Sequence, residues 1–261
     1  MSSNTHLRFN SHIGRQKPES IVNRETACPF CNRSQLSGIL AEEGNIIWLK
    51  NKYPVLEDTL QTVIIETHEC DSDLSLYTPD HLHRLFRFAF AKWQDMSDSG
   101  DYASVLFYKN HGPYSGGTIR HPHMQIVGLK YVDAMQHVEE SQFTGIVIAK
   151  RQGVELNVST LPRVGFVEFN VLLDDLRYLD DCADFTQIAV HYIMNHFSRN
   201  CNSYNLFFYG LHGEWRVKIV PRFVTSPLYV GFGIPQVSDR IDEVAEEIKE
   251  RYFVEQERLE V

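Results

Sequence analysis

Long hydrophobic runs are missing from this chain of 261 residues. No stretch approaches the roughly 18–20 consecutive apolar residues that a membrane-spanning helix needs, so we expect no membrane segment. Residues 1–20 also lack the apolar core that a secretory signal requires. The two absences together predict a cytoplasmic protein.

A surplus of positive charge is missing as well, because 34 acidic residues outnumber 25 lysines and arginines and give a net charge of −9. General binders of nucleic acid or of anionic membranes need a basic face, so the charge argues against both partners. It still allows a small phosphate ligand in a locally positive pocket. The length suffices for one large domain or two packed halves with a substantial core.

Cysteine is scarce, with five residues at positions 28, 31, 70, 182 and 201. In a reducing compartment the close pair Cys28-Pro-Phe-Cys31 is better interpreted as metal-binding than as a disulfide. Such a pair needs two further ligands, for which His68 or Cys70 and one histidine of "HPH" (121–123) are candidates. Four cysteine and histidine ligands would close a tetrahedral site, so the metal would be a structural zinc ion.

The apolar patterns predict strands, a helix and strands, and then the same order again. One helix is expected from Pro79, with Thr78 as its N-cap, and a second over Phe185 to Phe197; a tail helix begins near Ser238. Strands are expected at 45–50, 62–66, 104–110, 124–129, 144–150, 154–160, 164–173, 204–210 and 214–223. This order indicates an α+β fold with antiparallel sheets and an internal duplication.

The predicted division of the chain has three parts. Residues 1–26 are polar and basic and read as a flexible N-terminal arm. Residues 27–142 form a catalytic half with the cysteine knuckle, and residues 143–261 form a second half that ends in a helix.

The stretch "GGTIRHPHMQIVG" (116–128) carries the most chemistry. If a metal holds His121, then Pro122 restricts the backbone and His123 projects with a defined ring orientation. A positioned neutral imidazole can attack a phosphorus atom and form a covalent phosphoramidate. His123 is therefore the candidate nucleophile.

Such a nucleophile needs support from its surroundings. The preceding loop offers the small residues Gly112, Gly116 and Gly117 and the hydroxyl of Thr118, which allow a phosphate to approach the backbone. The amide of Gln125 could donate to a non-bridging oxygen. A partner on the far ring nitrogen, often a backbone carbonyl, has to set the tautomer.

Three charged or titratable neighbours, Lys109, His111 and Arg120, could each touch phosphate. For all three, an exposed position in the loop is the favoured interpretation.

The segment "FYKNHGPYSGGTIRHPHMQIVG" (107–128) resembles the active-site segment of galactose-1-phosphate uridylyltransferase and its relatives in the histidine-triad superfamily. The pattern is carried by Asn110, Gly112, Gly116, Thr118, His121, Pro122, His123 and Gln125. The ordered resemblance extends over residues 28–130.

The resemblance implies a role for each matching residue. His123 would carry a nucleoside monophosphate, and Gln125 would contact its phosphate. His121, Cys28 and Cys31 would bind zinc. The fourth ligand, a histidine in the family, falls on Cys70, with His68 as the alternative and loss of the site as a further one. Asn51 and Tyr53 in "NKYP" would contact the ribose and the base.

The resemblance also implies a fold of two fused histidine-triad halves and a function. The expected activity moves a nucleoside monophosphate from a nucleotide sugar or a dinucleotide to a phosphorylated acceptor, in a protein that could be a homodimer. Hydrolases of the superfamily have a third histidine where this chain has Gln125, so transfer is favoured. A nucleotide hydrolase and a non-catalytic nucleotide-binding module are the alternatives.

Overall fold

The computed structural model describes residues 6–254, which form two compact units. The first unit contains residues 6–73 and 84–138, and the second contains residues 74–83 and 139–254. The start of the predicted arm, residues 1–5, and the end of the predicted second half, residues 255–261, lie outside the described part. Among the described residues, no helix combines the length and the apolar composition needed to cross a membrane.

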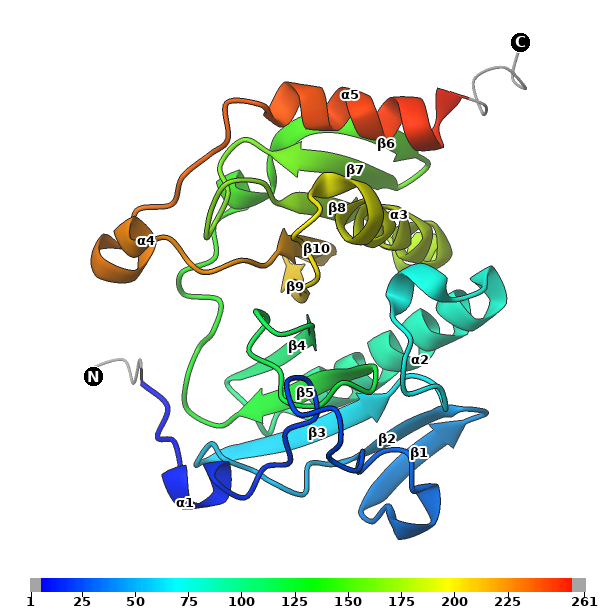
Figure 1. Cartoon of the computed structure of the whole chain (residues 1–261), viewed down its shortest axis with the longest axis vertical. Coiled ribbons are helices and arrows are strands. Elements are labelled where there is room, and N and C mark those ends of the chain that lie inside the picture. Colours follow the sequence, from blue (N-terminus) through cyan, green and yellow to red (C-terminus); the bar gives the residue numbers. More distant parts are fainter. Residues whose placement is uncertain (1–5, 255–261) are drawn as a thin grey trace. The chain divides into compact units, whose positions relative to one another are not determined.

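The first unit is built on an antiparallel sheet with the strand order β1-β2-β3-β5-β4, shown in blue to green in Figure 1. Its strands are β1 (Ile39–Glu43), β2 (Ile46–Lys50), β3 (Thr59–Ile65), β4 (Ser104–His111) and β5 (His123–Leu129).

Helix α2 (Pro79–Asp98) begins where the sequence predicts, and the Thr78 carbonyl accepts a hydrogen bond from Leu82 N at 2.9 Å. Its predicted apolar face is confirmed, because every member is at most 5% exposed: Leu82, Leu85, Phe86, Ala89, Phe90 and Trp93.

The two faces of the first sheet differ because side chains alternate along each strand. Phe107 of β4 contacts Phe90 and Trp93 of α2, with ring centroids 6.0 and 5.6 Å apart, so this face is covered by the helix. The opposite face carries a separate apolar cluster of Phe30, Ile47, Leu49, Val63 and Ile65. The candidate site lies on this second face.

The second unit repeats the topology of the first. Its strands follow the order β6-β7-β8-β10-β9, and helix α3 (Leu179–Tyr192) comes between β8 and β9 as α2 comes between β3 and β4. The strands are β6 (Gly145–Arg151), β7 (Val154–Ser159), β8 (Phe169–Leu173), β9 (Tyr204–Leu211) and β10 (Glu214–Pro221). The matching order confirms the predicted α+β fold with two similar halves.

Shorter elements complete the chain. The helices are α1 (Ser11–Gly14), α4 (Pro227–Phe232) and α5 (Ile241–Tyr252). Single turns of 3-10 helix occupy Arg33–Gln35, Leu74–Leu76, Glu140–Phe143 and Leu176–Tyr178, and a π-helical turn covers Ile193–Phe197.

Several elements differ from the prediction: helices α1 and α4 were not expected, and β8 begins at Phe169 rather than at residue 164. Strand β1 was not expected, because its side chains are mostly exposed and show no alternation that would mark a buried face. Helix α3 begins at Leu179 rather than Phe185, and Asp180 and Asp181 in its first turn suit the positive end of the helix dipole. The tail helix begins at Ile241, three residues after the predicted start.

The N-terminal segment from residue 6 to residue 26 lies against the first unit. Phe9 forms a bridge with Leu56, and Asn10 N donates to the Val55 carbonyl at 2.7 Å. Further along, Ser20 N donates to the Thr118 carbonyl at 2.8 Å. These bonds bring the segment to the glycine-rich loop of the candidate site.

Candidate active site

The His-Pro-His segment enters β5 beside the end of β3. His123 is the first residue of β5 and pairs with Ile65, while Glu66 N donates to the Pro122 carbonyl at 3.2 Å. His123 is 7% exposed. The strand pairing therefore holds the candidate nucleophile by its main chain, on the face that α2 does not cover.

The ring of His123 is held in one tautomer. Its Nδ1–H donates to the His121 carbonyl at 2.7 Å, so the lone pair is on Nε2. Burial disfavours the charged imidazolium, and with the nearby Lys109 charge it lowers the pKa of His123 to about 4. At neutral pH the ring is uncharged, as a nucleophile must be.

His123 opens into a pocket of about 500 Å³ in the first unit. Eight predicted residues line it: Asn51, Tyr53, Asn110, Gly116, Gly117, Thr118, His123 and Gln125. The predicted Gly112 is not among the lining residues. Five residues that the sequence did not single out also line the pocket: Lys17, Pro18, Phe30, Val63 and Ile119.

The glycine-rich loop has a conformation that requires glycine. Gly112 and Gly116 have φ values of 81° and 85°, in the region that side chains disfavour. A Cβ on Gly117 would lie 3.3 Å from Asn110 Cβ, so a small residue is needed there as well. The Ser115 hydroxyl donates to the Gly112 carbonyl at 2.7 Å, which closes the loop internally.

The "NKYP" loop contains an Asx-turn, in which Asn51 Oδ1 accepts a hydrogen bond from Tyr53 N at 2.8 Å. Asn51 N in turn donates to the Gln61 carbonyl of β3 at 2.8 Å. Both predicted residues of this loop therefore face the pocket from a defined backbone.

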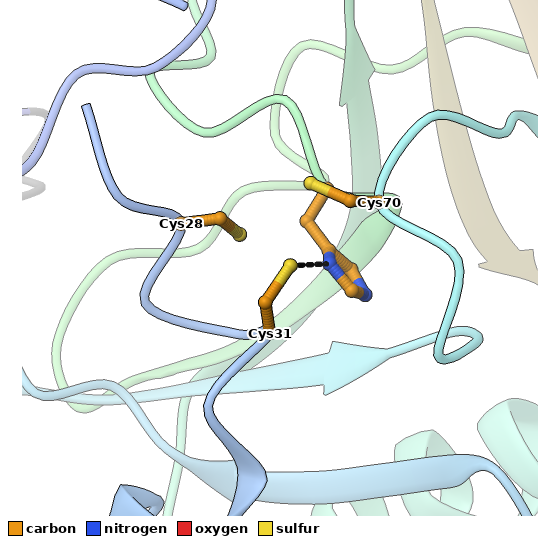
Figure 2. A group of neighbouring side chains, drawn as sticks. Cys28, Cys31 and Cys70 are labelled. Atoms are coloured by element: carbon orange, nitrogen blue, oxygen red, sulfur yellow. Dashed lines mark hydrogen bonds between the residues drawn. The ribbon is translucent and has the colours of Figure 1, made fainter. Parts of the chain in front are cut away.

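Four potential metal ligands gather beside the pocket. One ligand atom each of Cys28, Cys31, Cys70 and His121 lies within 4.8 Å of the others. Figure 2 shows the three thiols converging, two from the knuckle and one from the loop after β3. The alternative His68 is exposed and outside this group. This cluster could bind a metal ion.

The donor set fits a metal of tetrahedral preference. Nε2–H of His121 donates to the Thr67 carbonyl at 2.8 Å, which leaves the Nδ1 lone pair directed at Cys31 Sγ, 3.6 Å away. A ligating histidine whose other nitrogen is held by a carbonyl is the usual arrangement in metal sites. Desolvation raises the pKa of both Cys28 and Cys31, so metal binding would have to release their protons.

Phe30, inside the cysteine knuckle, lies between the metal cluster (the possible ligands Cys28, Cys31, Cys70 and His121) and the candidate nucleophile His123. Its buried ring meets the His121 and His123 rings edge-on, with centroids 5.9 and 5.4 Å apart. Phe30 also belongs to the apolar cluster on the sheet. The phenylalanine in "CPFC" indicates an apolar contact inside the knuckle. The sequence does not show which distant residues its ring contacts.

The interpretation of the three charged neighbours as exposed loop residues was wrong for Lys109 and His111, whereas Arg120 does lie in the loop and is partly exposed. Lys109 is fully buried on β4 and donates a hydrogen bond to the buried Glu66. His111 ends β4, and burial lowers its pKa to about 4. Arg120 is 25% exposed and turns toward Cys70 and Asp71. Alternation along β4 places Lys109 on the same face as Phe107, which explains its burial.

Among its described residues, the second unit has no counterpart of this site. Strand β10 has the position in its sheet that β5 has in the first, yet its sequence "EWRVKIVP" contains no histidine or cysteine. Lys218 of β10 is buried and donates to the Gln142 carbonyl at 2.7 Å and to Asn170 Oδ1 at 2.8 Å. The centroid of the buried Phe143 ring lies 5.2 Å from Lys218 Nζ.

Two family models match consecutive parts of the chain. Residues 9–132 match "Domain of unknown function (DUF4931) N-terminal domain", and residues 135–253 match the corresponding C-terminal domain. No curated protein matches the sequence.

Solved structures share the fold. A DUF4931 family protein from Bacillus cereus is 47% identical, with a TM-score of 0.76 over 82% of this chain and 99% of that chain. An ADP-glucose phosphorylase from Arabidopsis thaliana with bound ADP-glucose is 16% identical, with a TM-score of 0.73 over 87% and 90%. A uridylyltransferase is also 16% identical, with a TM-score of 0.68 over 85% and 90%.

Proposed function

This chain belongs to the DUF4931 family, and we propose that it is a nucleotidyltransferase or phosphorylase that works through a covalent nucleotidyl-His123 intermediate. The observation that carries the proposal is the state of His123. Its ring is neutral, its Nδ1–H is held by a carbonyl, and the ring faces a pocket of about 500 Å³ together with Gln125.

In the first step, Nε2 of His123 attacks the α-phosphorus of the nucleotide. The nitrogen–phosphorus bond forms as the bond from phosphorus to the bridging oxygen breaks, and the leaving phosphate takes the electron pair. The positive charge that develops on the ring is shared with Nδ1–H, which the His121 carbonyl stabilises. The proton stays on Nδ1 throughout.

In the second step, a phosphate oxygen of the acceptor attacks the same phosphorus, and the electron pair of the nitrogen–phosphorus bond returns to Nε2. A phosphate group leaves as an anion without needing a proton, so neither step needs a general acid. Gln125 cannot titrate, and its amide is placed two residues along β5 from His123, on the same face. This combination favours transfer over hydrolysis.

Binding of the nucleotide would use the residues that line the pocket. Gly116 and Thr118 offer backbone N–H groups beside the pocket, and no side chain crowds Gly116. The Gly117 N–H donates to Ser115 Oγ at 3.3 Å, and the glycine keeps the approach open. Lys17 adds a positive charge. Asn51 and Tyr53 lie on the "NKYP" loop, where a ribose and base could be held.

The metal cluster would hold a structural zinc ion, bound by Cys28, Cys31, Cys70 and His121. When bound, zinc fixes the backbone around His121 and so the orientation of its neighbours. We expect the purified protein to contain about one zinc per chain, and Cys28→Ser to lose most of it. Metal analysis by mass spectrometry checks this, and a zinc-free wild type would remove the structural role.

The covalent intermediate is tested by intact-protein mass spectrometry. The protein is incubated separately with UDP-sugars, ADP-sugars and diadenosine polyphosphates; an ADP-sugar comes first, because a phosphorylase of this fold holds ADP-glucose. We expect a mass gain of one nucleoside monophosphate, absent in His123→Gly. Wild-type turnover by His123→Gly would refute the mechanism. Turnover without a phosphate acceptor would indicate hydrolysis, and tight binding without adduct would indicate a binding module.

A further inference from the structure

The metal cluster contains three thiols and one imidazole. Three thiolates and a neutral imidazole around a divalent ion leave one negative charge in excess, whereas two thiolates and two imidazoles would leave none. A partly buried excess charge is unfavourable unless a charge of opposite sign is close. The three thiolates of Cys28, Cys31 and Cys70 share this excess, so a compensating cation should lie beside one of them.

Arg120 lies at that position. Its Nη2 is 3.6 Å from Cys70 Sγ, and its Nε is 3.1 Å from Asp71 Oδ1. The Arg120 side chain is 25% exposed and that of Asp71 is 72% exposed. Water screens the exposed carboxylate, so Asp71 neutralises the guanidinium only weakly. The ion pair instead orients the planar fork so that Nη2 points at the sulfur.

Hydrogen bonds hold both the main chain of Arg120 and the side chain of the next residue, His121. Arg120 N donates to Ser20 Oγ at 3.1 Å, and the adjacent His121 donates through Nε2 to the Thr67 carbonyl at 2.8 Å. The Arg120 side chain therefore extends from a backbone whose position is restricted. Groups that hydrogen-bond a metal ligand from outside in this way adjust the affinity of the site.

We infer that Arg120 compensates the charge of the third thiolate, Cys70, and thereby strengthens zinc binding at a site of three cysteines and one histidine. The inference rests on the zinc centre proposed above. Arg120 is a positioning residue that acts through Cys70, and it does not contact the substrate phosphate. A chain with histidine in place of Cys70 would have no need of this cation.

The first test compares zinc affinities, measured under reducing conditions by competition with a chromophoric chelator. Arg120→Gln keeps a hydrogen-bond donor and loses the charge, and we expect it to weaken zinc binding about 10- to 100-fold. Arg120→Lys, which keeps the charge, should lose less. Arg84→Gln is the matched control, because Arg84 is exposed on helix α2, which covers the other face of the sheet; it should retain the wild-type affinity.

The second test repeats Arg120→Gln in a Cys70→His background, where the site is neutral. There we expect the substitution to leave the zinc affinity unchanged. An equal loss in both backgrounds, or equal effects of Arg120→Gln and Arg84→Gln, would overturn the inference. The cobalt-substituted proteins provide a check, because the thiolate-to-cobalt charge-transfer band should weaken in Cys70→His. A wild type without tightly bound zinc would refute the zinc centre itself, whereas a zinc-loaded wild type insensitive to Arg120→Gln would refute only the compensation.

Discussion

Single residues in the first unit show how much chemistry depends on hydrogen bonds to carbonyls. The two histidines of the His-Pro-His segment are two residues apart, yet they expose different nitrogens. His121 donates from Nε2 to Thr67, and His123 donates from Nδ1 to His121. One ring therefore presents Nδ1 to the thiols and the other can present Nε2 to the pocket. Nothing in the residue type alone would assign these roles.

Lys17 is the residue for which we expect a binding effect without a chemical one. It lines the pocket from the N-terminal segment. If its ammonium group contacts a substrate phosphate, Lys17→Gln should raise KM about 10-fold and leave kcat little changed, because the lost contact is present before and during the reaction. Steady-state kinetics with the substrate found by mass spectrometry measures both constants. Lys130→Gln, at an exposed position of the same unit, is the control, and an equal change in that variant would dismiss the role of Lys17.

At the scale of elements, the end of β3 holds the active-site segment from two sides. Glu66 N donates to the Pro122 carbonyl, and the Thr67 carbonyl accepts from His121. The Glu66 side chain is itself joined to Lys109 of β4, and both side chains are fully buried. The ion pair therefore connects β4 to the turn that positions both histidines.

We expect this buried pair to matter for stability as a pair. Lys109→Met removes the cation that compensates Glu66 and should lower the free energy of unfolding by ~3–5 kcal/mol. The double variant Lys109→Met/Glu66→Leu should recover much of that loss, because no buried charge is left to compensate. Urea denaturation of the single and double variants measures the coupling.

The pair Lys150–Glu155, whose lysine is exposed, is the control for this cycle. Lys150→Met should change the free energy of unfolding far less than Lys109→Met, since water screens the exposed ammonium group. A Lys109→Met variant as stable as Lys150→Met, or a double variant that simply adds the two single losses, would contradict the expectation.

At the scale of the whole molecule, the chain repeats one topology with two different outcomes. In the first unit, the sheet face opposite α2 holds a pocket. In the second unit, Lys218 of β10 instead donates to the Gln142 carbonyl and to Asn170 Oδ1, and the Phe143 ring centroid lies 5.2 Å from its Nζ. Lys218 also lies 3.0 Å from the buried Glu168, which balances its charge. The second unit thus keeps the fold and lacks the chemistry of the site.

One nucleotide per chain is the expected stoichiometry of the covalent intermediate, since only the first unit offers a histidine in the required position among the described residues. Intact-protein mass spectrometry at saturating substrate should show a single addition, and peptide mapping under mildly alkaline conditions should place it on His123. A second addition, or one that survives in His123→Gly, would show that another residue takes part.

The sequence by itself determined which reactive and metal-binding side chains are present and in which order the helices and strands follow. The knuckle, the glycine-rich loop and the His-Pro-His-x-Gln segment are local patterns, and their spacing alone indicates which atoms can bind a metal or attack phosphorus. The faces of α2 were also readable, because helical periodicity records burial directly.

The tertiary structure alone decided which distant residues join that chemistry. It brought Cys70 rather than His68 to the thiols, Lys17 to the pocket, Lys109 into the interior and Arg120 to Cys70. Each of these contacts links segments many residues apart through the packing of several strands. Periodicity encodes which side of an element is buried, and it contains no information on which other segment will cover that side.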